Sequence, residues 1–69
     1  LNREAAILDH LEEAPATAHA LAQAIYTDTP STLMGAATRN VLAHLIDLSG
    51  RSEVYALGTI TEDAQFLRL

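Results

Sequence analysis

The chain has 69 residues and a net charge of −5, and 49% of its residues are hydrophobic, thirteen of these being alanine. A chain this short buries only about 60% of the surface that its unfolded form exposes, so we expect a single domain over residues 1–69 with a thin core. It has no cysteine, which excludes disulfide bridges and thiolate zinc sites. It also has no lysine, so four arginines are the cations that could attract nucleic acid or an anionic membrane.

The first predicted helix runs from Asn2, a residue type that caps helix N-termini, to about Glu13. Its apolar positions recur at helical spacing, at Ile7, Leu8 and Leu11. Pro15 stops this helix, and Thr17 is placed to cap a second one that ends at Tyr26. The apolar stripe of the second helix consists of Ala18, Leu21, Ala22 and Ile25.

A turn-rich loop centred on Pro30 precedes the third predicted helix. We expect Leu33 and Met34 to form a short helical turn, and we place Gly35 near the start of the helix because glycine costs about 1 kcal/mol in a helix interior. A regular apolar stripe follows at Ala37, Val41, Leu45 and Leu48. Gly50 is suited to stop the helix at its C-terminus.

Two short strands are predicted after the helices, over residues 53–57 and 65–69, with a polar loop at 58–64. Val54 in the first and Phe66 in the second are residue types that strands favour. Three helices followed by a hairpin is the order of a winged helix–turn–helix. The predicted fold class is therefore α+β, mainly α, with three helices and a two-stranded β wing.

An ordered set of residues with fixed spacings resembles one known family. The set is Arg3, Glu4, Ile7, Leu11, Pro15, Thr17, Leu21, Ile25, Tyr26, Pro30, Leu33, Ala36, Ala37, Val41, Ala43, His44, Leu45, Leu48 and Val54. Over about residues 3–56 the chain resembles the C-terminal winged-helix domain of a branch of metallo-β-lactamase-superfamily hydrolases. It departs from that family at Gly35, where proline is common, and after Gly50, where the match is poor.

This resemblance implies that the chain is a C-terminal fragment of a longer, metal-dependent hydrolase. In the family a preceding catalytic domain carries the metal ligands in a His-x-His-x-Asp-His motif, and the present sequence has no such motif. We therefore expect no catalytic, cofactor-binding or metal-binding residue in this chain, and zinc in the missing catalytic domain. The expected role is accessory: the domain would pack on the N-terminal catalytic domain of the same protein and shape its substrate entrance or a homodimer contact.

The sequence has none of the features of a membrane protein. No apolar run reaches the roughly 18 residues that cross a bilayer. No basic-then-apolar leader opens the sequence either. We expect a cytoplasmic protein without membrane contact.

His44 is the residue of the third helix that most invites a functional interpretation. It flanks the apolar stripe, so the favoured interpretation is a half-buried imidazole that packs and hydrogen-bonds a neighbour. The alternative is an interdomain or substrate-side contact, for which Arg39 and Asn40 are the other candidates. A metal role is disfavoured, because Asp47 at i+3 offers a single weak partner.

The competing function is that of a winged-helix DNA-binding transcriptional regulator. Arg39 and Asn40 are residue types that contact base edges. However, residues 31–49 have no net charge, and the wing loop holds Glu62 and Asp63 without a cation. Because DNA-binding domains usually need several phosphate contacts from lysine or arginine, nucleic acid is the less favoured partner.

Leu42 and Ile46 lie off the main stripe of the third helix, one turn apart. A second apolar seam of this kind indicates contact with another domain or with a second copy in a dimerisation module. The alternative is that the first helix or the hairpin covers both residues.

Overall fold

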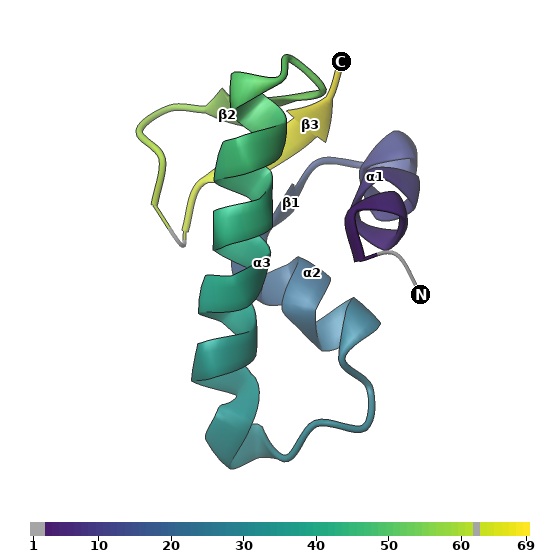
Figure 1. The fold of residues 1–69 in the computed structure, drawn as a ribbon, viewed down its shortest axis with the longest axis vertical. Helices are drawn as coiled ribbons and strands as arrows, with labels where there is room; N and C mark the ends of the chain where they lie inside the picture. The colour runs from purple at the N-terminus through teal and green to yellow at the C-terminus, as the bar shows by residue number, and fades with distance from the viewer. Residues whose placement is uncertain (1–2, 62) are drawn as a thin grey trace.

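The computed structural model describes residues 3–61 and 63–69. Its elements are α1 (Arg3–Glu13), β1 (Ala16–Thr17), α2 (Ala18–Ile25), the short 3-10 helix η1 (Ser31–Leu33), α3 (Met34–Gly50), β2 (Val54–Leu57) and β3 (Gln65–Arg68). α3 runs the length of the molecule, with α1 and α2 on one side and the loop that joins β2 to β3 on the other (Figure 1). Three helices and a small antiparallel sheet confirm the predicted winged-helix fold class.

The first two helices begin and end near the predicted residues. The Thr17 side chain caps α2 by accepting a hydrogen bond from the Ala20 N–H at 3.1 Å, and Tyr26 ends that helix. α1 ends at Glu13 as predicted. The cap predicted at Asn2 lies outside the described residues.

The turn before α3 lies slightly earlier than predicted. It is η1, Ser31–Leu33, whereas the sequence placed it at Leu33 and Met34. Met34 is already the first residue of α3, so Gly35 lies in the first turn of this helix, as predicted.

α3 ends at Gly50, as predicted, but the left-handed residue of its C-terminal cap is not this glycine. Gly50 is the last helical residue, and the left-handed position belongs to Ser52, with φ of 60°. The Ser52 N–H donates to the Ser49 carbonyl at 3.0 Å, and the Glu53 N–H donates to the Leu48 carbonyl at 2.9 Å. These two bonds form a Schellman motif in which serine takes the place usually held by glycine. Helical hydrogen bonding thus continues past the glycine before the chain turns towards β2.

The sheet contains a strand that the sequence did not predict. β1 pairs antiparallel with β3 (Ala16 with Phe66, Thr17 with Gln65), and β3 pairs with β2 on its other side, which gives the order β1-β3-β2. The predicted two-stranded wing is therefore incomplete, although its two strands lie within one residue of their expected bounds. A two-residue strand shows no alternating pattern in the sequence. It forms because pairing there satisfies the second edge of β3.

The core lies between α3 and the elements that pack against it. Its buried residues are Ile7, Leu11, Ala18, Leu21, Ala22, Ala37, Val41, Leu45, Leu48, Val54, Ala64 and Phe66. The four predicted stripe positions of α3 are all among them. Thr38 is buried as well, and its hydroxyl donates to the Met34 carbonyl at 2.8 Å. Within the described residues, no helix is long and apolar enough to cross a membrane.

Replacing Leu45 tests the role of the α3 stripe. Leu45 is fully buried, so Leu45→Ala should lower the free energy of unfolding by about 2–5 kcal/mol through lost burial and the cavity left behind. Urea unfolding followed by circular dichroism measures this change. The control is Leu33→Ala, which removes the same atoms from a side chain that is 55% exposed and should change stability by less than about 0.5 kcal/mol. Equal effects of the two substitutions would contradict the packing described.

Candidate functional site

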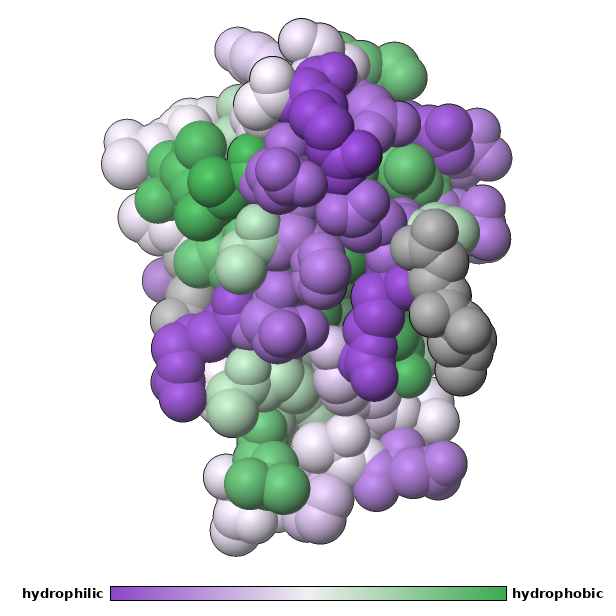
Figure 2. Space-filling view, in the orientation of Figure 1, coloured by the Kyte–Doolittle hydropathy of each residue, from purple (hydrophilic) through white to green (hydrophobic). Residues whose placement is uncertain are grey.

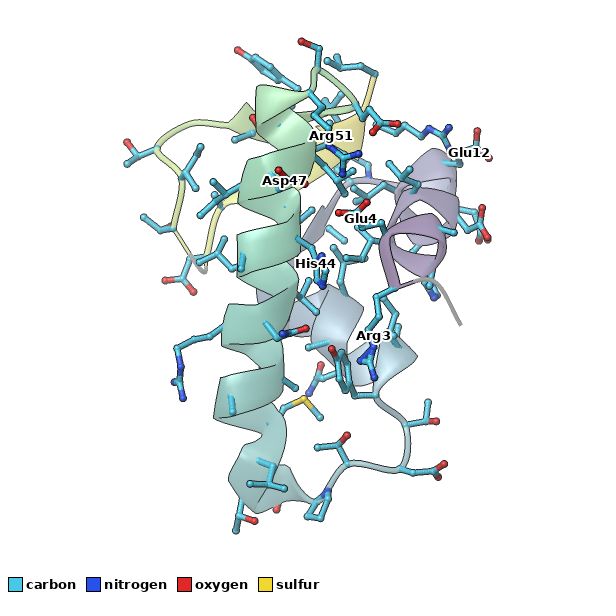
Figure 3. The ribbon with its side chains drawn as sticks, viewed as in Figure 1. Arg3, Glu4, Glu12, His44, Asp47 and Arg51 are labelled. Carbon is cyan, nitrogen blue, oxygen red and sulfur yellow. The ribbon has the colours of Figure 1, made fainter. Side chains whose placement is uncertain are left out.

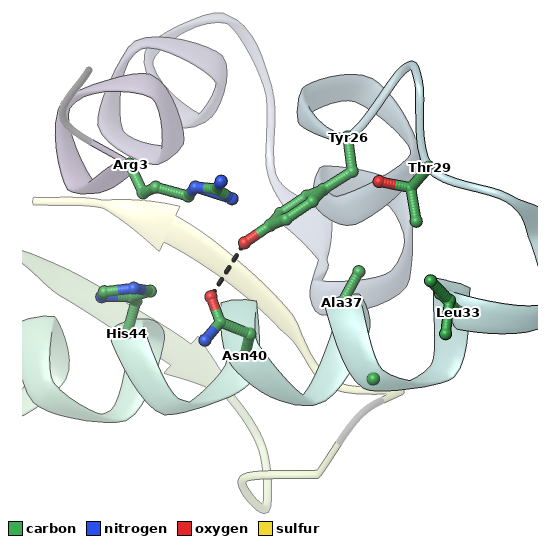
Figure 4. A pocket seen from close by; sticks show the side chains of 8 residues that line it. Arg3, Tyr26, Thr29, Leu33, Ala37, Asn40 and His44 are labelled. Atoms are coloured by element: carbon green, nitrogen blue, oxygen red, sulfur yellow. Dashed lines mark hydrogen bonds between the residues drawn. The ribbon is translucent and has the colours of Figure 1, made fainter.

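A pocket of about 540 Å³ opens between the N-terminal end of α1, the segment that follows α2, and one side of α3. Its lining residues are Arg3, Tyr26, Thr29, Leu33, Ala36, Ala37, Asn40 and His44 (Figure 4). Leu33, Ala36 and Ala37 make the lining mainly apolar at the η1 end, where Thr29 also lies, and the lining towards α1 is polar. The pocket thus brings together residues that lie far apart in the sequence.

Three side chains from three helical segments contact one another across this pocket. The guanidinium carbon of Arg3 lies 4.1 Å from the centroid of the Tyr26 ring, which is a cation–π distance. The Tyr26 hydroxyl donates a hydrogen bond of 2.8 Å to Asn40 Oδ1 (Figure 4). Tyr26 can reach both partners because it is the residue at which α2 ends and the chain turns away.

A cluster of charged side chains borders the pocket where α1 meets α3. Glu4 Oε1 accepts a hydrogen bond from Arg51 Nη2 at 2.7 Å, and Glu4 Oε2 lies 3.5 Å from His44 Nδ1 (Figure 3). Arg51 also pairs with Asp47 at 3.0 Å and with Glu53 at 3.5 Å. This Glu4–Arg51 cluster, defined by Glu4, His44, Asp47, Arg51 and Glu53, ties the start of α1 to the last turns of α3.

The Glu4–Arg51 hydrogen bond changes the acidity of both partners. It holds the pKa of Glu4 below the ordinary value of a glutamate, because the guanidinium stabilises the ionised carboxylate. The same hydrogen bond raises the pKa of Arg51. At neutral pH Glu4 and Arg51 therefore form an ion pair.

The predicted contact residues are divided between two sides of α3. His44 and Asn40 line the pocket, whereas Arg39 is exposed and lies outside the lining. The His44 side chain is 34% exposed and contacts Glu4, as expected of a half-buried imidazole that packs beside a polar neighbour. A contact role for the three residues stays a prediction.

Arg3 and Tyr26 belong to the pocket, but the sequence did not single them out as site residues. Tyr26 marks the end of a helix in the sequence, and its bond to Asn40 joins residues 14 positions apart. No local pattern connects such residues, because their proximity depends on how α1 and α2 pack on α3. Among the described residues, no group of three or more histidine, aspartate or glutamate side chains is placed to hold a metal ion.

Three helices and a β hairpin, with α2 and α3 as the helix–turn–helix pair, define a winged-helix domain. A family model described as the beta-lactamase associated winged helix domain matches residues 17–59, from the cap of α2 into the loop after β2. Because this match covers more than half of the sequence, the chain belongs to that family, which confirms the assignment made from the sequence. Comparisons with curated proteins and with solved structures found no match.

The Glu4–Arg51 cluster makes the stability of the domain depend on pH. Because the folded-state pKa of Glu4 is lowered, its contribution is present above the unfolded-state pKa and is lost as pH falls through the folded-state pKa. We expect Glu4→Gln to lower stability at pH 7 and to flatten the loss of stability between about pH 5 and pH 3. Urea midpoints across this range measure the effect. The exposed Glu13, as Glu13→Gln, is the control, and an unchanged acid dependence in Glu4→Gln would contradict the assignment.

Proposed function

We propose that this winged-helix domain is an accessory domain of a metallo-β-lactamase-fold hydrolase and packs on its catalytic domain. The observation that carries the proposal is the family match over residues 17–59, which includes the whole of α2, α3 and β2. Under this proposal zinc is held by the catalytic domain, where it supplies an activated water. The present chain contributes surface rather than catalytic groups, and Arg39, Asn40 and His44 are the candidates for a substrate-side contact.

The wing side of α3 offers the apolar surface that such packing needs. Of the two seam residues, Leu42 is half-buried and packs against the core, so the fold itself covers it. Ile46 stays 49% exposed. Leu57 and Ile60 of the hairpin are 45% and 44% exposed, and their loop runs beside α3 (Figure 1). Figure 2 shows apolar surface on this side of the molecule. We call Ile46, Leu57 and Ile60 the wing-side apolar residues.

The wing-side residues and the pocket lie on different sides of α3. Each residue of an α-helix advances by about 100°, so Ile46, two residues after His44, points about 200° away from it. A domain that packs on Ile46 therefore leaves the pocket accessible. This separation supports assigning the packing to the wing side.

The charges of the described residues support a protein partner over nucleic acid. Arg51 is surrounded by three carboxylates, and Arg68 pairs with Glu12 at 3.4 Å. Asn40 is one of the two residues suited to base contacts, and its Oδ1 already accepts a hydrogen bond from the Tyr26 hydroxyl. Arg39 is thus the cation that α3 presents on its exposed side. One such contact gives little of the phosphate neutralisation on which DNA binding depends.

Substituting the wing-side residues tests the accessory role in the complete protein. Ile46→Asp/Ile60→Asp should open the interface, because buried anchor residues each contribute about tenfold or more to association. We expect faster proteolytic cleavage between the domains and a lower kcat/KM. Leu69→Asp introduces one such charge at another exposed apolar residue and should change neither. Unchanged cleavage in the double variant would argue against packing at this surface, and zinc-dependent hydrolysis by residues 1–69 alone would refute the accessory role.

A gel-shift titration at low salt separates the accessory role from DNA binding. Because Arg51 and Arg68 pair with carboxylates, only Arg3 and Arg39 among the described arginines can neutralise phosphate. We therefore expect weak binding of duplex DNA at low salt, with a Kd above about 10⁻⁴ M once the salt is raised to the physiological level. A basic winged-helix domain that binds DNA serves as the positive control. Tight binding with a steep dependence on salt would instead favour the regulator.

A further inference from the structure

The polar groups that line the pocket are rich in hydrogen-bond donors. They are the Arg3 guanidinium, the Asn40 amide, the Thr29 hydroxyl and a ring nitrogen of His44, whereas the Tyr26 O–H is already donated to Asn40. The lining contains no carboxylate, although the chain has nine acidic residues and a net charge of −5. A concave site with this composition, in an acidic protein, favours a ligand that accepts hydrogen bonds and carries negative charge.

Arg3 is the main source of positive charge in the pocket. Arg51 and Arg68 are paired with carboxylates, whereas Arg3 makes no ion pair with any residue that the structure describes. Its guanidinium carbon lies over the Tyr26 ring, 4.1 Å from the centroid. Stacking engages the face of a guanidinium and leaves the N–H groups along its edge free. Arg3 is therefore held at the pocket with its charge available to a carboxylate, which a guanidinium can bind through two parallel hydrogen bonds.

Asn40 supplies a second donor with a fixed orientation. Its Oδ1 accepts the Tyr26 hydroxyl at 2.8 Å, so the amide N–H₂ is the group left for a ligand. Tyr26 thus holds both donor side chains, one by stacking and the other by its hydroxyl (Figure 4). A site whose donors are fixed before binding loses less entropy when the ligand enters.

The other end of the pocket is mainly apolar. Ala36 and Ala37 form part of its wall on α3, and Leu33 contributes a side chain that is 55% exposed. Covering this surface would be favourable for a hydrophobic group. The volume of about 540 Å³ is sufficient for a small molecule, which this wide-open pocket would cover on one side. The ligand should therefore combine an acidic group with a short apolar body.

We infer that the pocket binds a carboxylate carried on a short apolar body, with Arg3 and Asn40 as the donors that hold it. A carboxylate fits better than a phosphate, because Glu4 lies 3.5 Å from His44 at the border of the pocket and would repel a second negative charge. The carboxylate can belong to a free acid or to an acidic side chain of a peptide. This inference does not depend on the accessory role, because the pocket and the wing-side residues lie on different sides of α3.

The test is a titration of the ¹⁵N-labelled 69-residue chain, followed by amide chemical shifts. The probes are 4-methylpentanoate, 4-methylpentanamide, inorganic phosphate and the blocked peptide acetyl-Leu-Asp-Leu-amide. We expect saturable shifts around Tyr26 and Asn40 with the carboxylate probes, and binding about tenfold weaker or more for the amide and for phosphate. Tighter binding of the free acid than of the peptide assigns the site to a small molecule, and the reverse order assigns it to a polypeptide.

Two arginine substitutions provide matched variants. Arg3→Gln should weaken binding of 4-methylpentanoate by about tenfold or more, because it removes the charge and the bidentate geometry. Arg3→Lys keeps the charge and should give an intermediate loss. Arg39→Gln makes the same charge change outside the pocket and should leave binding unchanged. Equal binding of acid and amide, equal effects of Arg3→Gln and Arg39→Gln, or no saturable shift with either carboxylate probe would overturn the inference.

Discussion

Burial of one face of α3 organises this domain, because α1, α2 and the sheet all contact it. The core is thin, so a few large side chains provide most of the hydrophobic stabilisation, among them Leu45 and Leu48 of α3 and Phe66 of β3. The small residues Ala18 and Ala22 are buried as well and allow α2 to approach α3 closely. Once this face of α3 is fixed, the directions of its other side chains follow from the helical repeat.

The pocket forms because polar contacts hold the N-terminal end of α1 against α3. Glu4 binds Arg51 across 47 positions of sequence and also contacts His44. This places the N-terminal end of α1 beside the end of α2, where Arg3 reaches the ring of Tyr26. In the same cluster, carboxylates neutralise the charge of Arg51. The contact that places Arg3 at the pocket therefore also removes the positive charge of Arg51 from the surface. Fold stability and pocket chemistry are coupled through α1.

Local patterns in the sequence were sufficient to predict the helices but not the pocket. The stripe of α3 and the Thr17 cap were predictable because each depends on residues within a few turns. β1 was not predictable, because a strand of two residues is too short to show an alternating pattern. It also pairs with a strand about fifty positions later in the sequence. The Schellman turn at Ser52 was missed since glycine is the usual residue there. The contacts of Tyr26 could not be predicted either, because they arise from tertiary packing.

The position of α3 in a helix–turn–helix pair suggests a recognition helix, yet its chemistry favours packing. A helix that reads DNA must present free donors and cations together on its exposed face. Here the exposed side of α3 presents Arg39 and Ile46 about two turns apart, while the amide of Asn40 turns to Tyr26 on the pocket side. The helix therefore divides its surface between an apolar side next to the wing and a donor-rich side next to α1. Such a division suits a domain that uses one side to pack and the other to bind a small acidic group.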